Sequence, residues 1–319
     1  MHSLQARIEC RYLGRARETT TNIHDKSVLV TGSTGNQGGA TARHLLAAGW
    51  RVRALVRDAT TPTAAALAAA GAEVVRGDLD DRASLDAAIR GVYGVFSVQA
   101  AGANEVTQGK NVVDAAKAAG VQHLVYSSVG GMQSQNRFYV EHGWGPIDKW
   151  QIEQHIHDRG VPATILRPAG FMEDFTCPAR FFQNGTLTVP WHDDLVMQLI
   201  AIDDIGALAA LIFAKADTYL GQAMEITGDR LTAPQIAAAL STAADRTIPH
   251  THVPLDMLWE HDPEVAKVFT WANESYYGSD PEPLRKTHPG LMDFRTWLER
   301  SGRMRLMAQQ DAAGKRPGT

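Results

Sequence analysis

Short aliphatic and β-branched runs alternate with longer, Ala-rich segments from residue 26 onward. The runs predict buried strands, because each is short and is followed by a Gly-rich or polar turn. They span residues 27–30, 51–56, 72–78, 92–98, 123–129 and 163–168. Strands that alternate with helices form a parallel sheet covered by helices on both faces. The pattern therefore predicts an α/β fold with a doubly wound parallel sheet.

Beyond residue 168 the regular alternation ends and shorter elements follow. Strands are expected at 185–190, 195–202, 223–229 and 249–254, and helices at 203–216, 232–244 and 294–302. We interpret this part as a smaller C-terminal α+β lobe on the substrate side. The predicted division is a flexible N-terminal extension (1–25), an α/β core (26–170), the lobe with elements returning to the core (171–307) and a polar tail (308–319).

Composition and charge exclude several classes of protein. The chain has 319 residues, 44% of them hydrophobic and 21% charged, as is usual for a globular protein. Lys and Arg number 31 against 35 Asp and Glu, so we expect no nucleic-acid partner. The longest strongly apolar stretch, 205–214, falls short of the roughly 20 residues that a membrane span needs, so no membrane partner is expected. Cys10 and Cys177 form no Cys-x-x-Cys motif, which favours a reducing, cytoplasmic location.

A glycine-rich loop, TGSTGNQGG, joins the first predicted strand to the first predicted helix. A dinucleotide-binding loop needs this context, because the first N–H groups of the helix hold the phosphates. Gly32 permits the tight turn, Gly35 lets the backbone approach a pyrophosphate, and Gly38 lets the helix pack closely on the sheet. The predicted cofactor-binding residues of the loop are Gly32, Ser33, Thr34, Gly35, Asn36, Gln37 and Gly38.

The end of the second strand indicates which dinucleotide is bound. An acidic residue there binds the ribose 2′-hydroxyl of NAD, whereas an arginine accepts the 2′-phosphate of NADP. Arg57 holds this position, and Asp58 comes one residue too late and is expected to face solvent. NADP is therefore favoured over NAD, the alternative being that Arg57 is simply a solvated charge. Asp78 is placed to meet the adenine amino group, although one of the clustered aspartates could equally cap a helix.

Four motifs, TGSTGNQGG, VRD, GDLDD and LRPAGFMEDF, resemble in order and spacing those of the NmrA-like family of atypical short-chain dehydrogenases/reductases. The resemblance covers about residues 26–300 and implies an NAD(P)-binding Rossmann fold. It implies that Arg57 binds the 2′-phosphate and that Asp78 and Leu79 contact adenine. It also assigns Lys149 to the nicotinamide ribose. The other segments that it places near the nicotinamide are Val98, Gln99 and Ala100, and Phe171, Met172, Glu173 and Asp174.

The family includes NAD(P)H-dependent quinone or related reductases, and also regulators that bind the dinucleotide and act through a protein partner. This chain departs from the usual reductase pattern of a serine followed by Tyr-x-x-x-Lys. Ser127, Ser128 and Lys149 are present, but Gly145 stands where the tyrosine is expected. Tyr139 lies farther upstream in a stretch that we predict to be a loop. Carbonyl reduction of the usual type is therefore not expected.

Other residues offer candidate chemistry. Lys149 could support charge on a conjugated acceptor or serve in cofactor binding alone. His142, with Trp144, could line the substrate mouth as a proton donor or merely cap a loop. His155 and His157 face different directions on a helix, and we assign no metal site. The aromatic residues of the lobe form either its core or lid, or an apolar pocket for an aromatic substrate; they are Trp259, Phe269, Trp271, Tyr276 and Tyr277.

These observations give two functional hypotheses. The first is an NADPH-dependent reductase of small, quinone- or enone-like conjugated acceptors. The second is a non-catalytic NADP(H)-binding redox sensor that acts through a protein partner. An apolar cavity beside the nicotinamide and a measurable rate of NADPH oxidation would distinguish the first from the second.

Overall fold

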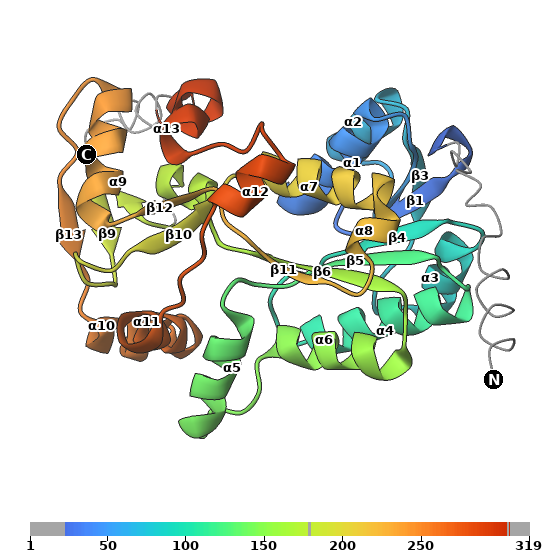
Figure 1. Cartoon of the computed structure of the whole chain (residues 1–319), viewed down its shortest axis with the longest axis horizontal. Helices are drawn as coiled ribbons and strands as arrows, with labels where there is room; N and C mark the ends of the chain where they lie inside the picture. The colour runs from blue at the N-terminus through green and yellow to red at the C-terminus, as the bar shows by residue number, and fades with distance from the viewer. Residues whose placement is uncertain (1–22, 178–179, 305, 307–319) are drawn as a thin grey trace, which may run out of the picture.

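A seven-stranded parallel sheet forms the centre of the molecule, with strand order β11-β6-β5-β4-β1-β2-β3. The structure is a computed structural model and describes residues 23–177, 180–304 and 306 (Figure 1). The strands are β1 (Ser27–Val30), β2 (Arg51–Val56), β3 (Glu73–Arg76), β4 (Gly94–Ser97), β5 (His123–Ser127), β6 (Ala163–Pro168) and β11 (Ala223–Ile226). The predicted doubly wound fold is confirmed. From β1 the strands are added in one direction up to β3 and then in the opposite direction from β4, so the topology switches between β1 and β4. Ligands of such sheets bind at this switch point, outside the carboxyl ends of the strands.

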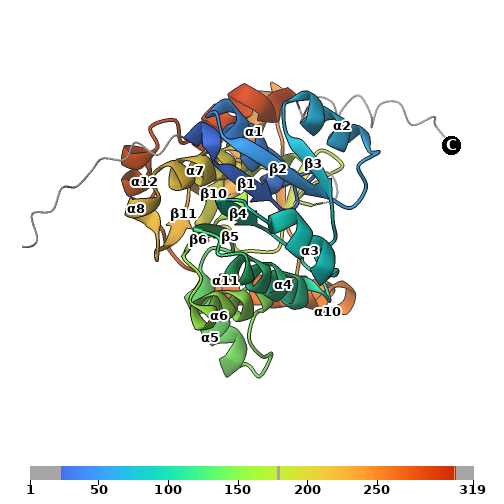
Figure 2. The same ribbon diagram turned by 90° about the vertical axis from the view of Figure 1, so that its right-hand side faces the viewer.

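Helices cover both faces of this sheet, as Figure 2 shows. One face carries α1 (Asn36–Ala47), α2 (Pro62–Ala69), α7 (Ile202–Ala214) and α8 (Ala216–Tyr219). The other carries α3 (Arg82–Ile89), α4 (Glu105–Ala118) and α6 (Asp148–Arg159). Because the inner strands β1, β4, β5 and β6 are almost entirely buried, most of their residues are apolar, and the sequence pattern revealed them.

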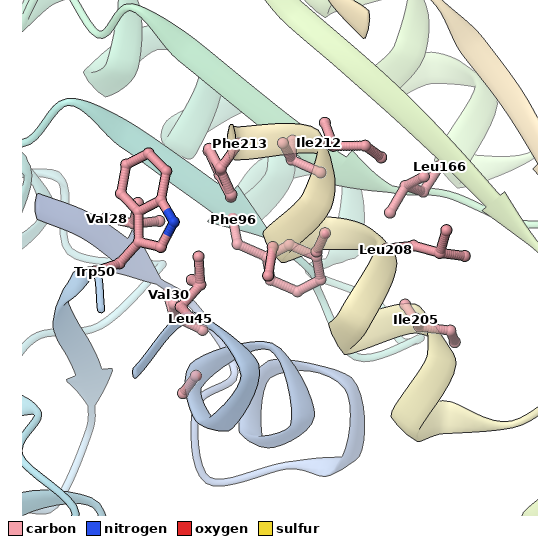
Figure 3. Packing of buried hydrophobic residues seen from close by; sticks show 14 of the residues in the cluster. Val28, Val30, Leu45, Trp50, Phe96, Leu166, Ile205, Leu208, Ile212 and Phe213 are labelled. Atoms are coloured by element: carbon pink, nitrogen blue, oxygen red, sulfur yellow. The ribbon is translucent and has the colours of Figure 1, made fainter. Parts of the chain in front are cut away.

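The α7 helix packs directly on α1 although about 160 residues separate them along the chain. A Cβ on Gly206 of α7 would lie 2.6 Å from the backbone carbon of Ala40 in α1, so the contact requires glycine. Figure 3 shows the apolar side chains of this layer, in which Ile205 and Leu208 of α7 lie with Phe96 of β4. The late part of the chain thus completes the core of the early part.

The remaining elements build the smaller lobe around two three-stranded sheets, β12-β10-β7 and β13-β9-β8. The strands are β7 (Gly170–Phe171), β8 (Phe182–Gln183), β9 (Thr186–Val189), β10 (Met197–Ile200), β12 (Asp229–Leu231) and β13 (His250–His252). The helices are α5 (Met132–Glu141), α9 (Ala233–Ala244), α10 (Leu255–His261), α11 (Pro263–Ser275), α12 (Glu282–Thr287) and α13 (Phe294–Trp297). Short turns complete the elements: 3-10 turns at Ile23–Asp25 and Met172–Thr176, and a π-helical turn at Leu298–Gly302.

Two expectations about local structure are wrong. The stretch around Tyr139 is the helix α5, which buries Met132, Phe138 and Tyr139. Most residues of α5 are polar, so its narrow apolar stripe is not evident from the sequence. The helix packs against α11, which lies far away along the chain. The expected strand 223–229 is two strands, β11 in the central sheet and the start of β12 in the lobe.

The division at residue 170 stays a prediction, as does the flexible extension. Most of that extension, the tail 308–319 and Cys10 lie outside the described residues. Within the described part of the chain, no helix is both long enough and apolar enough to cross a membrane.

Candidate cofactor and active site

The glycine-rich loop connects β1 to α1 at the carboxyl edge of the sheet. A Cβ on Gly38 would lie 2.3 Å from the carbonyl oxygen of Gly32, so only glycine lets α1 start this close to the loop. No side chain caps the start of α1 at Gly35. Its first N–H groups are therefore available to phosphate oxygens, which accept such bonds well at a helix N-terminus. The predicted phosphate-binding residues thus share a geometry that fits a pyrophosphate.

Two hydroxyl groups fix the loop to neighbouring strands. The Thr31 hydroxyl donates to the Val98 carbonyl at 3.0 Å and accepts from the Val98 N–H at 2.9 Å. The Ser33 hydroxyl donates to the carbonyl oxygen of Leu55 at 2.8 Å. This bond uses the one O–H donor of the Ser33 side chain. The contact that we predict between Ser33 and a phosphate must therefore come from its backbone N–H.

Arg57 is exposed at the end of β2 and makes no hydrogen bond or ion pair with any residue in the described part of the chain. Asp58 faces solvent, as expected. Its carboxylate accepts from the Thr60 hydroxyl at 2.6 Å and the Thr60 N–H at 2.8 Å, and these bonds lower the pKa of Asp58. Arg76, exposed at the end of β3 and in register with Val56, is a second cation beside the end of β2 and was not predicted from the sequence. The only indication of it in the sequence is that a basic residue, Arg76, lies near the end of the third predicted strand.

The aspartates after β3 divide between two roles. Asp81 caps α3, accepting from the N–H groups of Ala83 at 3.0 Å and Ser84 at 3.3 Å. Asp78 is half-buried, and among the described residues its carboxylate accepts only the Asp80 N–H, at 3.0 Å. The helix-capping alternative thus holds for Asp81. The adenine contact of Asp78 and Leu79 stays a prediction.

Gln99 lies at the carboxyl end of β4 and is 5% exposed. Its side-chain nitrogen donates to the Ser97 hydroxyl at 3.0 Å, whereas its side-chain oxygen is buried and has no partner among the described residues. A buried acceptor without a donor is costly, so this oxygen suits a ligand that brings a hydroxyl or amide N–H. This fits the nicotinamide ribose segment predicted for Val98, Gln99 and Ala100.

Lys149 lies in the first turn of α6, and its ammonium nitrogen is 2.5 Å from a carboxylate oxygen of Glu105. Glu105 lies in the first turn of α4, immediately after the segment that includes Gln99. The side chains are 20% and 5% exposed, so the pair is largely withdrawn from water. Glu105 was not predicted from the sequence, where its only signal is an acidic residue at the start of the helix after the fourth strand.

A second buried network lies behind Ser128. The Ser128 hydroxyl donates to Glu153 at 2.5 Å, and Arg167 donates to both oxygens of Glu153 at 3.1 and 2.7 Å. Glu225 accepts the Gly131 N–H at 2.9 Å and lies 3.6 Å from Arg167. Burial raises the pKa of Glu225. The network links β5, α6, β6 and β11, and none of its acidic members was predicted from the sequence.

The residues before Lys149 do not rebuild the usual tyrosine. Helix α6 begins at Asp148 with Ile147 as its N-cap. Gly145 lies outside the helix at φ +80°, where a tyrosine would be strained. Tyr139 is 8% exposed in α5, and burial raises its pKa to about 12.

His142 ends α5 and is exposed. Its Nδ1–H donates to the Phe138 carbonyl at 2.8 Å, and its ring stacks on Phe138 with centroids 3.9 Å apart. This is the capping arrangement weighed for it above. A catalytic role for His142 stays a prediction, and so does that of Lys149.

The segment after β6 is largely committed to the lobe. Met172 is fully buried, and the Glu173 carboxylate accepts the Ile202 N–H at 3.2 Å and the Trp297 indole N–H at 3.1 Å. Burial raises the pKa of Asp174. Phe171 is half-buried at the end of β7 and packs against the core of the central sheet, and the contact of these four residues with the nicotinamide stays a prediction.

Four of the five aromatic residues belong to the apolar core of the lobe, where Phe269 and Trp271 are buried and Tyr276 and Tyr277 pack against them. Phe269 stacks on Trp191 in the core, and Trp259 packs edge-on against Trp144 beside α5. Trp271 stacks on Tyr277, which covers the Gly130–Gly131 turn after β5. Packing thus accounts for most of them, and Tyr277 and Trp271 both reach the turn after β5. Among the described residues, no three His, Cys, Asp or Glu side chains are grouped so as to hold a metal ion.

The family model described as the NmrA-like family matches residues 24–298. The chain belongs to the NmrA-like family. An NAD(P)H azoreductase of Xenophilus azovorans is 31% identical over 231 residues, covering 72% of this chain and 78% of the relative. A (4-alkanoyl-5-oxo-2,5-dihydrofuran-3-yl)methyl phosphate reductase of Streptomyces griseus is 30% identical over 257 residues, covering 77% and 86%.

Solved structures of the negative transcriptional regulator NmrA have the same fold. The complex with NAD has a TM-score of 0.74 at 22% identity, and the complex with NADP has a TM-score of 0.72 at 21% identity. Both cover 91% of this chain and 98% of the solved chain. At this identity the likeness shows the fold alone.

Proposed function

We propose that this protein is an NADPH-dependent reductase of small conjugated acceptors, such as quinones and enones. The observation that carries the proposal is the juxtaposition of an uncapped glycine-rich loop, the unpartnered Gln99 oxygen and the Lys149 ammonium at one edge of the sheet. The two relatives reported above are both reductases, and one is named for NAD(P)H. The solved complexes of similar fold hold NAD in one case and NADP in the other, and the unpaired Arg57 favours NADPH here.

The roles of the residues follow from their positions. The start of α1 holds the pyrophosphate, Arg57 the 2′-phosphate, and Gln99 and Lys149 the nicotinamide ribose. NADPH, when bound, supplies the hydride, and the protein orients its nicotinamide towards the acceptor. The Lys149 ammonium stabilises negative charge that develops on the acceptor oxygen.

The absence of a tyrosine one turn before Lys149 sets the acceptor class. A simple ketone needs a proton donor at its oxygen, whereas a conjugated acceptor delocalises the charge and needs only electrostatic support. We therefore infer that quinones and enones react and that unconjugated ketones do not.

Steady-state oxidation of NADPH, followed at saturating cofactor over a panel of quinones, enones, azo compounds and unconjugated ketones, tests this proposal. Turnover is expected with conjugated acceptors and none with the ketones. Lys149→Gln should lower the turnover at saturating NADPH by more than its effect on cofactor binding explains. NADPH binding without oxidation by any acceptor would overturn the reductase proposal and leave the redox-sensor hypothesis in its place.

A further inference from the structure

The Glu105–Lys149 pair stands at a place where helix electrostatics disfavour the lysine. Lys149 lies in the first turn of α6, where the partial positive charge of the helix N-terminus repels a cation. Glu105 lies in the first turn of α4, where the same field favours an anion. The ion pair with Glu105 therefore offsets the repulsion between Lys149 and the N-terminus of α6. Lys149 does not stabilise its own helix.

We propose that Glu105 is a positioning residue that fixes the Lys149 ammonium against the nicotinamide ribose, an inference that rests on the cofactor site proposed above. An ammonium has three N–H donors. One meets Glu105 at 2.5 Å, which leaves two for the neighbouring hydroxyls of a ribose. Lysine has a long, flexible side chain, and anchoring it beforehand removes ordering that the cofactor would otherwise have to supply.

The backbone connects this pair to the ribose segment. Glu105 begins α4 directly after the loop that carries Gln99, and that loop follows β4. Both helices start at the carboxyl edge of the sheet, so the pair lies at the same edge as the glycine-rich loop. Burial of the Glu105 side chain, 5% exposed, keeps water from competing for the ammonium.

The same two helices supply a matched control. Asp114 of α4 pairs with Arg159 of α6 at 2.8 Å and with His155 at 3.0 Å, away from the strand ends. Asp114→Asn therefore removes a carboxylate of α4 that contacts α6 without touching the proposed ribose site. Any effect common to both variants reports the packing of α4 on α6 and not ribose recognition.

The test compares the binding of NADPH with that of 2′,5′-ADP, which lacks the nicotinamide ribose, by calorimetry. Glu105→Ala should raise the Kd for NADPH about tenfold and leave the Kd for 2′,5′-ADP within about twofold. Lys149→Gln should give a similar loss, and the double variant should lose little more than either alone. Asp114→Asn should change neither Kd. Glu105→Gln keeps a hydrogen-bond acceptor in a side chain of the same shape and should retain part of the affinity for NADPH. If Glu105→Ala does not fold, Glu105→Gln replaces it in the comparison.

An unchanged Kd for NADPH in Glu105→Ala, or in Glu105→Gln where only that variant folds, would overturn the inference. Equal losses for NADPH and 2′,5′-ADP would also overturn it, because they indicate a structural role. Failure of the parent protein to bind either compound would instead refute the cofactor site itself. Binding of NADPH without turnover would refute only the reductase function.

Discussion

The hydroxyl of Ser127 donates a hydrogen bond of 2.6 Å to the side-chain oxygen of Gln37. Ser127 ends β5 and Gln37 lies in the first turn of α1, so the bond joins the end of a strand to the start of a helix 90 residues away along the chain. Gln37 is thus held in place at the glycine-rich loop by a residue that the usual reductase pattern would assign to catalysis.

Ser127→Ala should weaken NADPH binding by about 0.5–1.5 kcal/mol, because Gln37 loses the partner that orders it. Gln37→Ala should have a similar effect. A double-mutant cycle measured by titration with NADPH should show strong coupling between the two positions. Additive losses would mean that the bond plays no part in cofactor binding.

Arg57→Ala should remove most of the preference for NADPH over NADH, a change of about 1.5–3 kcal/mol for a lost charge-assisted hydrogen bond. Titration of each variant with both cofactors measures it. Arg76→Ala should cause a smaller loss of the same kind, since Arg76 lies beside β2. The control is Arg90→Ala, because this exposed residue ends α3 at the opposite edge of the sheet. Equal affinities for both cofactors in the parent protein would refute the predicted role of Arg57.

Gly38→Ala should abolish detectable NADPH binding and lower the free energy of unfolding by about 1–3 kcal/mol. The new Cβ would lie 2.3 Å from the Gly32 carbonyl oxygen, so α1 must move away from the loop. Gly278→Ala places a Cβ with no atom within 4 Å and should leave both properties unchanged. Thermal unfolding and NADPH titration of the two variants give the comparison, and normal binding by Gly38→Ala would contradict the proposed loop geometry.

Stability should decrease as the pH falls from about 6.5 to 4 because of His123. Burial lowers the pKa of His123 to about 4, whereas the unfolded chain binds that proton near pH 6.5. The unfolded state therefore gains a proton first, and the stability present above pH 6.5 is lost towards pH 4, by about 3 kcal/mol at most. The Thr164 hydroxyl donates to Tyr219 and so receives the Nε2–H of His123, which leaves Nδ1 buried without a partner among the described residues.

His123→Gln should flatten this dependence in denaturant titrations between pH 4 and 6.5, since Gln has no titrating group and can still donate to Thr164. The control variant is His157→Gln, because His157 is exposed on α6 and should leave the slope as it is. An unaltered slope in His123→Gln would assign the pH dependence to other groups.

The parts of this molecule that the sequence predicted are those with local signals. The inner strands of the central sheet are buried and appear as apolar runs, and the glycine-rich loop has a fixed spacing. The pairing of Lys149 with Glu105, 44 residues away, has no such signal, because it depends on how α6 docks on α4. The network around Glu153 and Arg167 escaped prediction for the same reason. Helix α5 was missed because most of its residues are polar and its apolar stripe is explained only by α11.

Because α7 and β11 belong to the central sheet and come late in the chain, the sheet cannot finish folding until they have been synthesised. During synthesis from the N-terminus, β1, β4 and β6 emerge long before residues 202–226, which cover and extend their sheet. Until then Phe96 and Leu166 lack the Ile205 and Leu208 side chains that exclude water from them. A nascent chain released at residue 170 would therefore expose an apolar sheet face and an unpaired β6 edge, both of which favour aggregation. The nucleotide-binding half is complete only once most of the chain has left the ribosome.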